Sequence, residues 1–174
     1  MFALINYQNH VVSLAENKFD VSNLFSWVEV PKNTVVNAGH LYQNGIFIDP
    51  CYPDLENAQI YQKRLLSNAC QNAICRGFKS SALGASNLYA SGATDQRNIA
   101  QSAQSTTGGL VSLYNLTTNA WERTAHTQVQ AQQVLEDFVT FRDTCRTQLS
   151  TLEAQITAAT TIDDIKTIVW KAVP

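Results

Sequence analysis

The feature that most constrains this chain is residues 125–159, which contain no glycine and no proline. Apolar side chains recur there at intervals of three and four, the spacing of one face of an α-helix. The repeat is close to 3.5 residues, which suits a helical hairpin or an intersubunit bundle, but the side chains are too mixed in size for a committed coiled coil. The residues of this stripe are Val134, Phe138, Phe141, Cys145, Leu149, Leu152 and Ile156.

Two further helices are expected on either side of this segment. Pro53 and Asp54 suit a first helical turn, and the helix that they begin runs to about residue 74. Thr160 or Thr161 caps a last short helix that carries apolar residues as far as Trp170. For the first of these helices the predicted buried stripe is Ala58, Tyr61, Leu65, Ala69 and Ala73, broadened by Ile60, Leu66 and Ile74.

Short strands are expected before residue 50. The segments FALINY, VVSLAEN, SWVEV and GIFID have strand-like composition, and Asn44-Gly45 is typical of a two-residue hairpin turn. Two more hairpins are expected between the long helices, near residues 76–90 and 110–125. The prediction is an α+β protein, with a small β module at 1–50 for attachment and a mainly helical domain at 51–174 into which β-hairpins are inserted.

The stretch GFKSSALGASNLYASGATDQRN, at 77–98, is the strongest candidate for a functional loop. It has neither a phosphate-binding glycine motif nor the GxSxG arrangement of a serine nucleophile, so Ser80 and Ser81 are both expected to be structural. A hairpin that turns at Gly84 and leads into a helix near residue 96, capped by Thr94 or Asp95, explains the small residues better.

Outside this stretch, the sequence shows few candidate catalytic or metal-binding residues. The histidines are scattered, and the four cysteines are not spaced as metal ligands, so we expect no catalytic residue, no cofactor and no metal, and not an enzyme. A Cys/His pair would require tertiary proximity that sequence does not reveal. The cysteines are interpreted as small buried hydrophobic residues. Trp121 and Trp170 are expected to pack in a core, with interface anchoring as the alternative.

Charge excludes some partners and favours others. Charged residues make up only 15% of the chain, and 12 basic residues stand against 14 acidic ones without a basic cluster. Nucleic acid is therefore not an expected partner, and no segment is apolar enough to suggest a membrane span. A surface covered with Ser, Thr, Asn and Gln desolvates at lower cost than one covered with Lys and Glu, which suits broad protein contacts.

One set of residues forms a recognisable structural motif by its order and spacing: Gly77, Phe78, Gly84, Tyr89, Asp95, Gln96, Trp121 and His126. This pattern resembles a domain of unknown function that recurs in tail proteins of bacteriophages and prophages, and the resemblance covers roughly residues 60–170. It implies that the 77–98 hairpin is an internal clasp of a helical domain, in which Phe78, Leu83 and Tyr89 lie against the long helices.

A second resemblance lies in VEVPKNTVVNAGHLYQNGIFIDP, which is similar to the small β module of tail-fibre assembly proteins. Together the resemblances imply a non-enzymatic virion component in the tail, associated with the baseplate or the tail fibre as a link or adaptor, which assembles in the host cytoplasm. The implied partners are other tail, baseplate or fibre proteins and further copies in a symmetric homo-oligomer. The alternative is a tail-fibre assembly chaperone that is absent from the mature virion.

Overall fold

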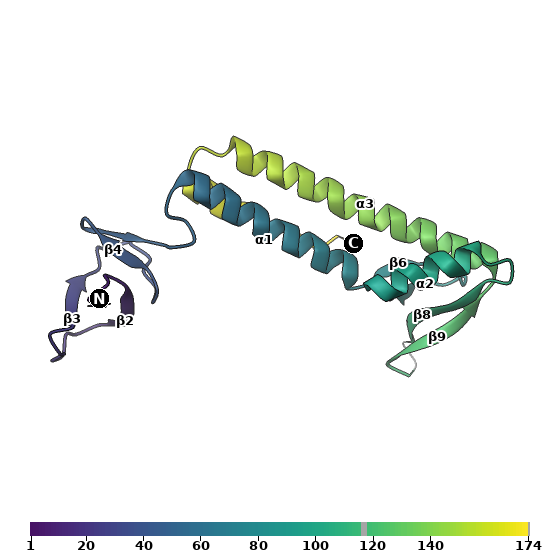
Figure 1. Ribbon diagram of the computed structural model, residues 1–174, viewed down its shortest axis with the longest axis horizontal. Helices are drawn as coiled ribbons and strands as arrows, with labels where there is room; N and C mark the ends of the chain where they lie inside the picture. The colour runs from purple at the N-terminus through teal and green to yellow at the C-terminus, as the bar shows by residue number, and fades with distance from the viewer. Residues whose placement is uncertain (116–117, 174) are drawn as a thin grey trace. The chain divides into compact units, whose positions relative to one another are not determined.

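The computed structural model describes residues 1–115 and 118–173 and confirms the α+β class, with a sheet at the N-terminus followed by helices and further strands (Figure 1). The chain divides into two compact units. The first comprises residues 1–61 together with 160–165, and the second comprises 62–159 together with the chain from residue 166 on. The division therefore falls within the first long helix, whereas the sequence suggested a boundary near residue 50.

The first unit contains two small sheets. Strands β1 (Phe2–Asn6), β2 (Val11–Ala15) and β3 (Phe25–Glu29) form an antiparallel sheet in the order β2-β1-β3. Strands β4 (Leu41–Gln43) and β5 (Ile46–Ile48) form a hairpin around Asn44 and Gly45, both of which have positive φ. That backbone is the one that an Asn-Gly hairpin turn requires. A core of Ala3, Val11, Val30 and Val36 holds this unit together.

Helix α1 (Leu55–Cys75) forms as expected, but its buried stripe differs from the prediction. Leu65 is 40% exposed and Ile60 is 60% exposed, so both face solvent. The buried residues follow one another at intervals of four, and one of them is the polar Gln62, whose amide donates to the Ile168 carbonyl at 2.7 Å. A hydrophobicity pattern cannot anticipate a buried glutamine. The observed stripe is Ala58, Gln62, Leu66, Cys70 and Ile74.

The two hairpins of the second unit join into a single sheet, which the sequence did not indicate. Strands β6 (Phe78–Ser80), β7 (Asn87–Tyr89), β8 (Gly109–Asn115) and β9 (Ala120–His126) are antiparallel and lie in the order β6-β7-β8-β9. Helix α2 (Ala93–Gln104) separates the two hairpins in sequence. The tip of the second hairpin was expected at 117–119, and residue 117 lies outside the described residues.

Helix α3 (Gln128–Ala158) begins later than the predicted residue 125, because Ala125 and His126 still belong to β9. Its start is set by a capping box, in which the Thr127 side chain accepts from the Gln130 amide and the Gln130 side chain accepts from the Thr127 amide.

Helix α4 (Ile162–Thr167) begins after Thr161, whose hydroxyl oxygen accepts from the Asp164 amide at 3.1 Å. It ends at Thr167, so the prediction that the helix extends as far as Trp170 is wrong.

The core of the second unit lies between helices α1, α2 and α3 and the inner face of the sheet. Buried Phe78, Tyr89, Val111 and Leu113 come from the strands, and the other members come from the helices. In Figure 1 α3 lies alongside the later part of α1 and reaches the sheet at its N-terminal end. The helical members of the core are Cys70, Ile74, Ile99, Val134, Phe138 and Cys145.

Candidate interaction surface

Three of the sequence-predicted residues meet in this core. Phe78 stacks on Tyr89 with ring centroids 5.8 Å apart, and it also contacts Phe138 at 5.3 Å. Tyr89 meets His126 edge to face at 5.6 Å. The strands bring these residues together because Phe78 and Tyr89 are cross-strand partners in the β6–β7 pair. Leu83 packs against the same cluster, as the clasp interpretation expects.

The Tyr89 hydroxyl and the His126 ring form a buried polar pair. The Nδ1 atom of His126 lies 2.9 Å from the Thr124 carbonyl oxygen, which can only accept, so Nδ1 carries the proton in the neutral ring. The Nε2 atom then accepts from Tyr89 Oη, also at 2.9 Å. Burial raises the pKa of Tyr89 to about 12, so this phenol stays protonated at neutral pH. The pair is therefore a structural hydrogen bond.

A serine that sequence reasoning missed connects two more of the predicted residues. Ser91 is buried, and its hydroxyl accepts from the Gly77 amide at 2.9 Å and donates to the Ile74 carbonyl at 2.6 Å. The Gln96 side chain donates to the Ser91 carbonyl at 2.8 Å. Gly77 has a φ of +117°, and a Cβ there would come within 2.9 Å of the Tyr89 carbonyl oxygen. The end of α1, strand β7 and the start of α2 are thus joined at Ser91.

Gly84, Asp95 and Trp121 were also predicted as motif residues, and they lie outside this buried cluster. Gly84 occupies the β6–β7 turn, where its amide donates to the Ser81 carbonyl at 2.8 Å. Asp95 does not cap a helix that begins near residue 96, because α2 already begins at Ala93 with Gly92 as its N-cap. Asp95 instead stands in the first turn, where a carboxylate complements the helix dipole. Trp121 is 50% exposed, so the expectation that it packs in a core is wrong.

Two of the free cysteines, Cys70 and Cys145, are buried. Burial raises the pKa of the Cys70 and Cys145 thiols, which favours the unreactive protonated form. Within residues 1–115 and 118–173, no group of three or more His, Cys, Asp or Glu side chains is arranged to hold a metal ion. In the same ranges, no helix is both long and apolar enough to cross a membrane.

The outer face of the sheet carries a continuous row of side chains, which we call the outer row: Lys79, Leu88, Tyr114 and Trp121. Lys79 pairs with Leu88, Leu88 with Tyr114, and Tyr114 with Trp121, so the row crosses all four strands. Directly paired residues share a face of a sheet. Their neighbours in sequence, such as Tyr89 and Leu113, point into the core, and the outer row therefore points away from it.

The outer row combines apolar exposure with positive charge. Leu88 is 37% exposed, and the Trp121 ring meets the Tyr114 ring edge to face at 5.4 Å. Arg123, on the edge strand β9, is paired with Ser112 on this same face, and Lys79 lies on the opposite edge strand, β6. Trp, Tyr and Arg are the residue types that most often anchor protein interfaces. The alternation of side chains in β8 and β9 was the one sign of this surface in the sequence. The sequence does not show the strand register that aligns the four residues of the row.

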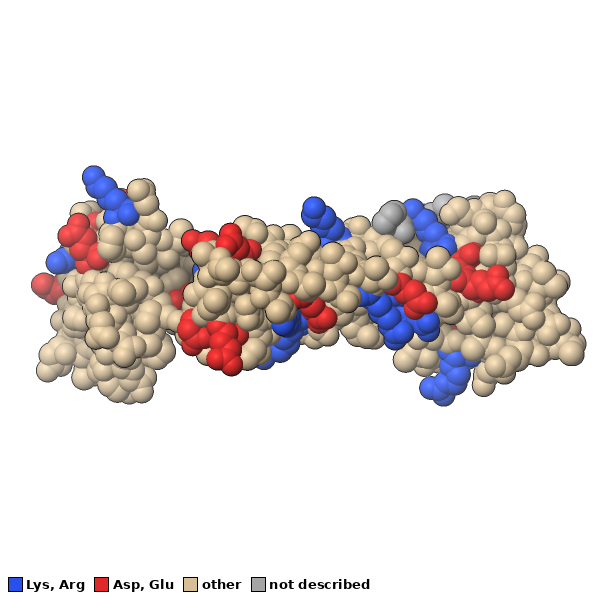
Figure 2. All heavy atoms as spheres, turned by 90° about the horizontal axis from the view of Figure 1, so that it is seen from above, with Lys and Arg blue, Asp and Glu red and all other residues tan. Residues whose placement is uncertain are grey.

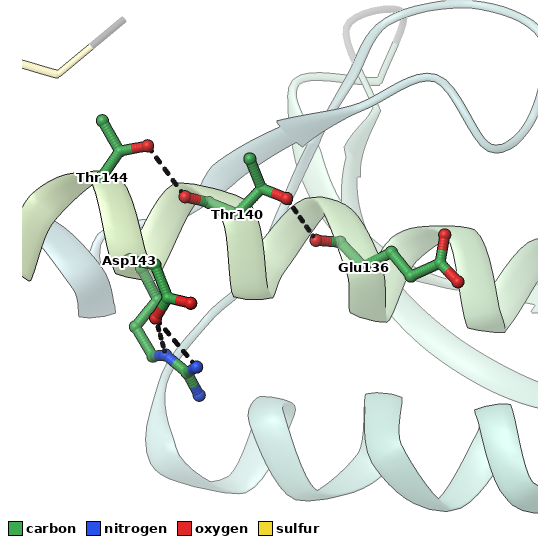
Figure 3. Close-up of polar contacts among 5 residues, drawn as sticks. Glu136, Thr140, Asp143 and Thr144 are labelled. Atoms are coloured by element: carbon green, nitrogen blue, oxygen red, sulfur yellow. Dashed lines mark hydrogen bonds and ion pairs between the residues drawn. The ribbon is translucent and has the colours of Figure 1, made fainter.

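A second surface lies along α3, and we call it the threonine face: Thr140, Thr144, Thr147 and Thr151. The Thr140 hydroxyl donates to the Glu136 carbonyl and the Thr144 hydroxyl to the Thr140 carbonyl, as Figure 3 shows. Thr151 does the same to Thr147. Because the Thr140, Thr144 and Thr151 hydroxyls are satisfied within the helix, these three residues present methyl groups at low desolvation cost. A shallow surface groove is lined by all four threonines.

Charged side chains are sparse on the surface. On the face seen in Figure 2, the Lys/Arg and Asp/Glu side chains form small separate areas with uncharged residues between them. Arg142 and Asp143 on α3 form an ion pair at 2.9 Å, which is drawn in Figure 3.

No family model, curated protein or solved structure matched this chain. The functional argument therefore depends on the surfaces described above.

Proposed function

We propose that this chain is a non-enzymatic structural component of a bacteriophage tail, associated with the baseplate or the tail fibre, where it links other tail proteins. The observation that carries the proposal is the outer row. An exposed leucine and tryptophan, aligned across four strands and flanked by a lysine and an arginine, is a surface suited to another protein. The sequence resemblance to phage tail proteins supplies the biological setting.

The first unit supports a linking role because it offers apolar surface of its own. Its small sheets leave several large side chains exposed. A link needs two attachment surfaces, and exposed apolar side chains on both compact units support such a role. The exposed apolar residues of the first unit include Tyr7 (74%), Phe19 (59%), Leu24 (58%), Val35 (80%) and Ile46 (63%).

Protein analysis of purified phage particles tests the proposal. A structural component is present in a fixed number of copies per particle. If the chain is required for assembly yet missing from finished particles, it is a fibre-assembly chaperone and the proposal is wrong.

The outer row is tested by truncating Leu88 and Trp121, its two exposed apolar side chains. Leu88→Ala with Trp121→Ala should lower incorporation into particles on the order of tenfold or more, because interface anchors contribute about 2 kcal/mol or more each. Val129→Ala is the matched control, since Val129 is 74% exposed but lies at the start of α3, outside the row. Equal incorporation of both variants would show that the outer row is not the attachment surface.

A further inference from the structure

A cavity in the second compact unit lies where helix α1 ends and strand β6 begins, and we call it the α1–β6 cavity. Its volume is about 540 Å³, and its walls come from the last turns of α1, from β6 and β7, from α3 and from residues 170–173. All of these segments belong to the same compact unit. Ligand sites in proteins commonly measure about 300–1,000 Å³, so this cavity is large enough for a small molecule.

The walls of the α1–β6 cavity are mainly apolar. Phe78 and Phe141 both line it, and their rings stack with centroids 6.3 Å apart. The half-buried Trp170 adds a third aromatic side chain. An apolar group bound among these rings is removed from water and gains dispersion contacts with them. The cavity therefore favours a ligand with an apolar body.

Two cationic side chains line the same cavity. Arg76 comes directly after the last residue of α1, Lys79 is the middle residue of β6, and both are exposed. None of the described residues that line the cavity is Asp or Glu. Within residues 1–115 and 118–173, neither cation forms an ion pair. Asp137 lines an adjoining groove that includes Lys79, and its carboxylate accepts from Gln133 at 2.9 Å.

The turn from α1 into β6 fixes where the two cations stand. Gly77, which separates α1 from β6 together with Arg76, has a φ of +117°, and its amide donates to the buried Ser91 hydroxyl at 2.9 Å. The Arg76 amide donates to the Ala73 carbonyl in the last turn of α1. The backbone that carries both charges is thus held before any ligand binds, which lowers the entropic cost of binding.

We propose that the α1–β6 cavity binds a small amphipathic anion, a molecule with an apolar chain and a carboxylate or phosphate head group. The apolar chain lies against the aromatic walls, and Arg76 and Lys79 bind the head group. A guanidinium group can hold a carboxylate or a phosphate through two parallel hydrogen bonds. This inference does not rest on the proposed tail function, and the particle analysis above can fail without affecting it.

Isothermal titration calorimetry on the full chain tests the ligand class. The probes are octanoate, octyl phosphate, octanol and octyltrimethylammonium, which share one apolar chain and differ in the head group. At least one of the two anions should bind once per chain, and the tighter of them identifies the head group. Octanol should bind at least about tenfold more weakly, because hydrogen bonds to charged groups are stronger than neutral ones. Failure of both anions to bind, or equal binding of octanol or octyltrimethylammonium, would overturn the proposal.

A pair of double variants tests the two cations. Arg76→Gln with Lys79→Gln should weaken binding of the anion at least about tenfold and leave octanol binding within about twofold. The matched control is Lys63→Gln with Arg146→Gln, which removes the same charge from α1 and α3 at positions that do not line the cavity. Equal weakening by the two double variants would mean that only net charge matters, and it would refute the assigned head-group site.

Nuclear magnetic resonance on the ¹⁵N-labelled natural chain locates the ligand without any substitution. Titration with the tighter anion should shift the backbone amides of Gly77 and Lys79 and the indole N–H of Trp170 more than other signals, since all three residues line the cavity. If the largest shifts fell in the first compact unit or on the threonine face, the anion would bind elsewhere and the proposal would be wrong.

Discussion

Replacing Tyr89 with phenylalanine removes one buried hydroxyl and leaves the ring in place. The ring keeps its contacts with Phe78 and His126, so packing changes little. The His126 Nε2 atom, on a side chain only 3% exposed, loses the donor that lies 2.9 Å away. A buried acceptor left without a partner costs about 1–3 kcal/mol, and we expect the free energy of unfolding to fall by that amount near neutral pH.

The same variant also changes the response to alkaline pH. Burial raises the Tyr89 pKa from 10.0 to about 12 in the folded protein. Because the folded-state pKa is the higher one, the contribution of Tyr89 is present below pH 10 and is lost between pH 10 and about 12. At about pH 11 the unfolded phenol is mostly ionised and the folded one is not, so the wild type loses about 1.4 kcal/mol through this group. Tyr89→Phe has no such loss.

Urea unfolding followed by far-ultraviolet circular dichroism, at about pH 8 and about pH 11, measures both effects. Tyr7→Phe is the matched control, because Tyr7 is 74% exposed, and its free energy of unfolding should stay within about 0.5 kcal/mol of the wild type. The reasoning would be refuted if Tyr89→Phe behaved like Tyr7→Phe near neutral pH. It would also be refuted if the wild type and Tyr89→Phe lost equal stability on going to alkaline pH.

Three further stability predictions concern the hairpin before α2, each checked by the same urea measurement. Phe78→Ala should cost about 3–5 kcal/mol, because its ring is 2% exposed, whereas a loss under about 1 kcal/mol would show that the ring is not a core anchor. Ser80→Ala should cost about 1 kcal/mol, since the buried Ser80 hydroxyl accepts from the Ala82 amide, while the exposed neighbour Ser81→Ala should change stability by less than about 0.5 kcal/mol. Gly77→Ala should lower the free energy of unfolding more than Gly84→Ala. An alanine at the positive φ of either position costs about 1–2 kcal/mol, but only at Gly77 would the added Cβ also meet the Tyr89 backbone. Equal losses would contradict that steric argument.

The elements with strong local signals were predicted well. Apolar side chains at intervals of three and four in residues 125–159, with no glycine or proline between them, identified α3. Asn44-Gly45 identified the β4–β5 turn. The predicted helix began too early, because the strand-forming end of β9 continues to His126 and the capping box at Thr127 starts the helix. Capping and strand pairing compete at such a boundary, and periodicity does not report their outcome.

The interaction surface was the least predictable part. Trp121 was expected in a core because large aromatic residues usually pack, yet its position opposite Tyr114 places it on the outer face. A shift of one residue in the β8–β9 register would have turned it inward. The sequence also did not distinguish Ser80 from Ser81, since nothing local shows that the Ser80 side chain is buried.

Local sequence determined which segments of this protein became helices, turns and most of the strands, because capping, turn conformation and periodicity act within a few residues. Contacts between distant segments determined the rest: Gln62 became a core residue by binding the backbone of Ile168, and two separate hairpins became one sheet through the β7–β8 pair. The outer row and the bond from Gln62 to Ile168 both depend on such pairings. Their energies come from groups far apart in the chain, which is why no local pattern encodes them.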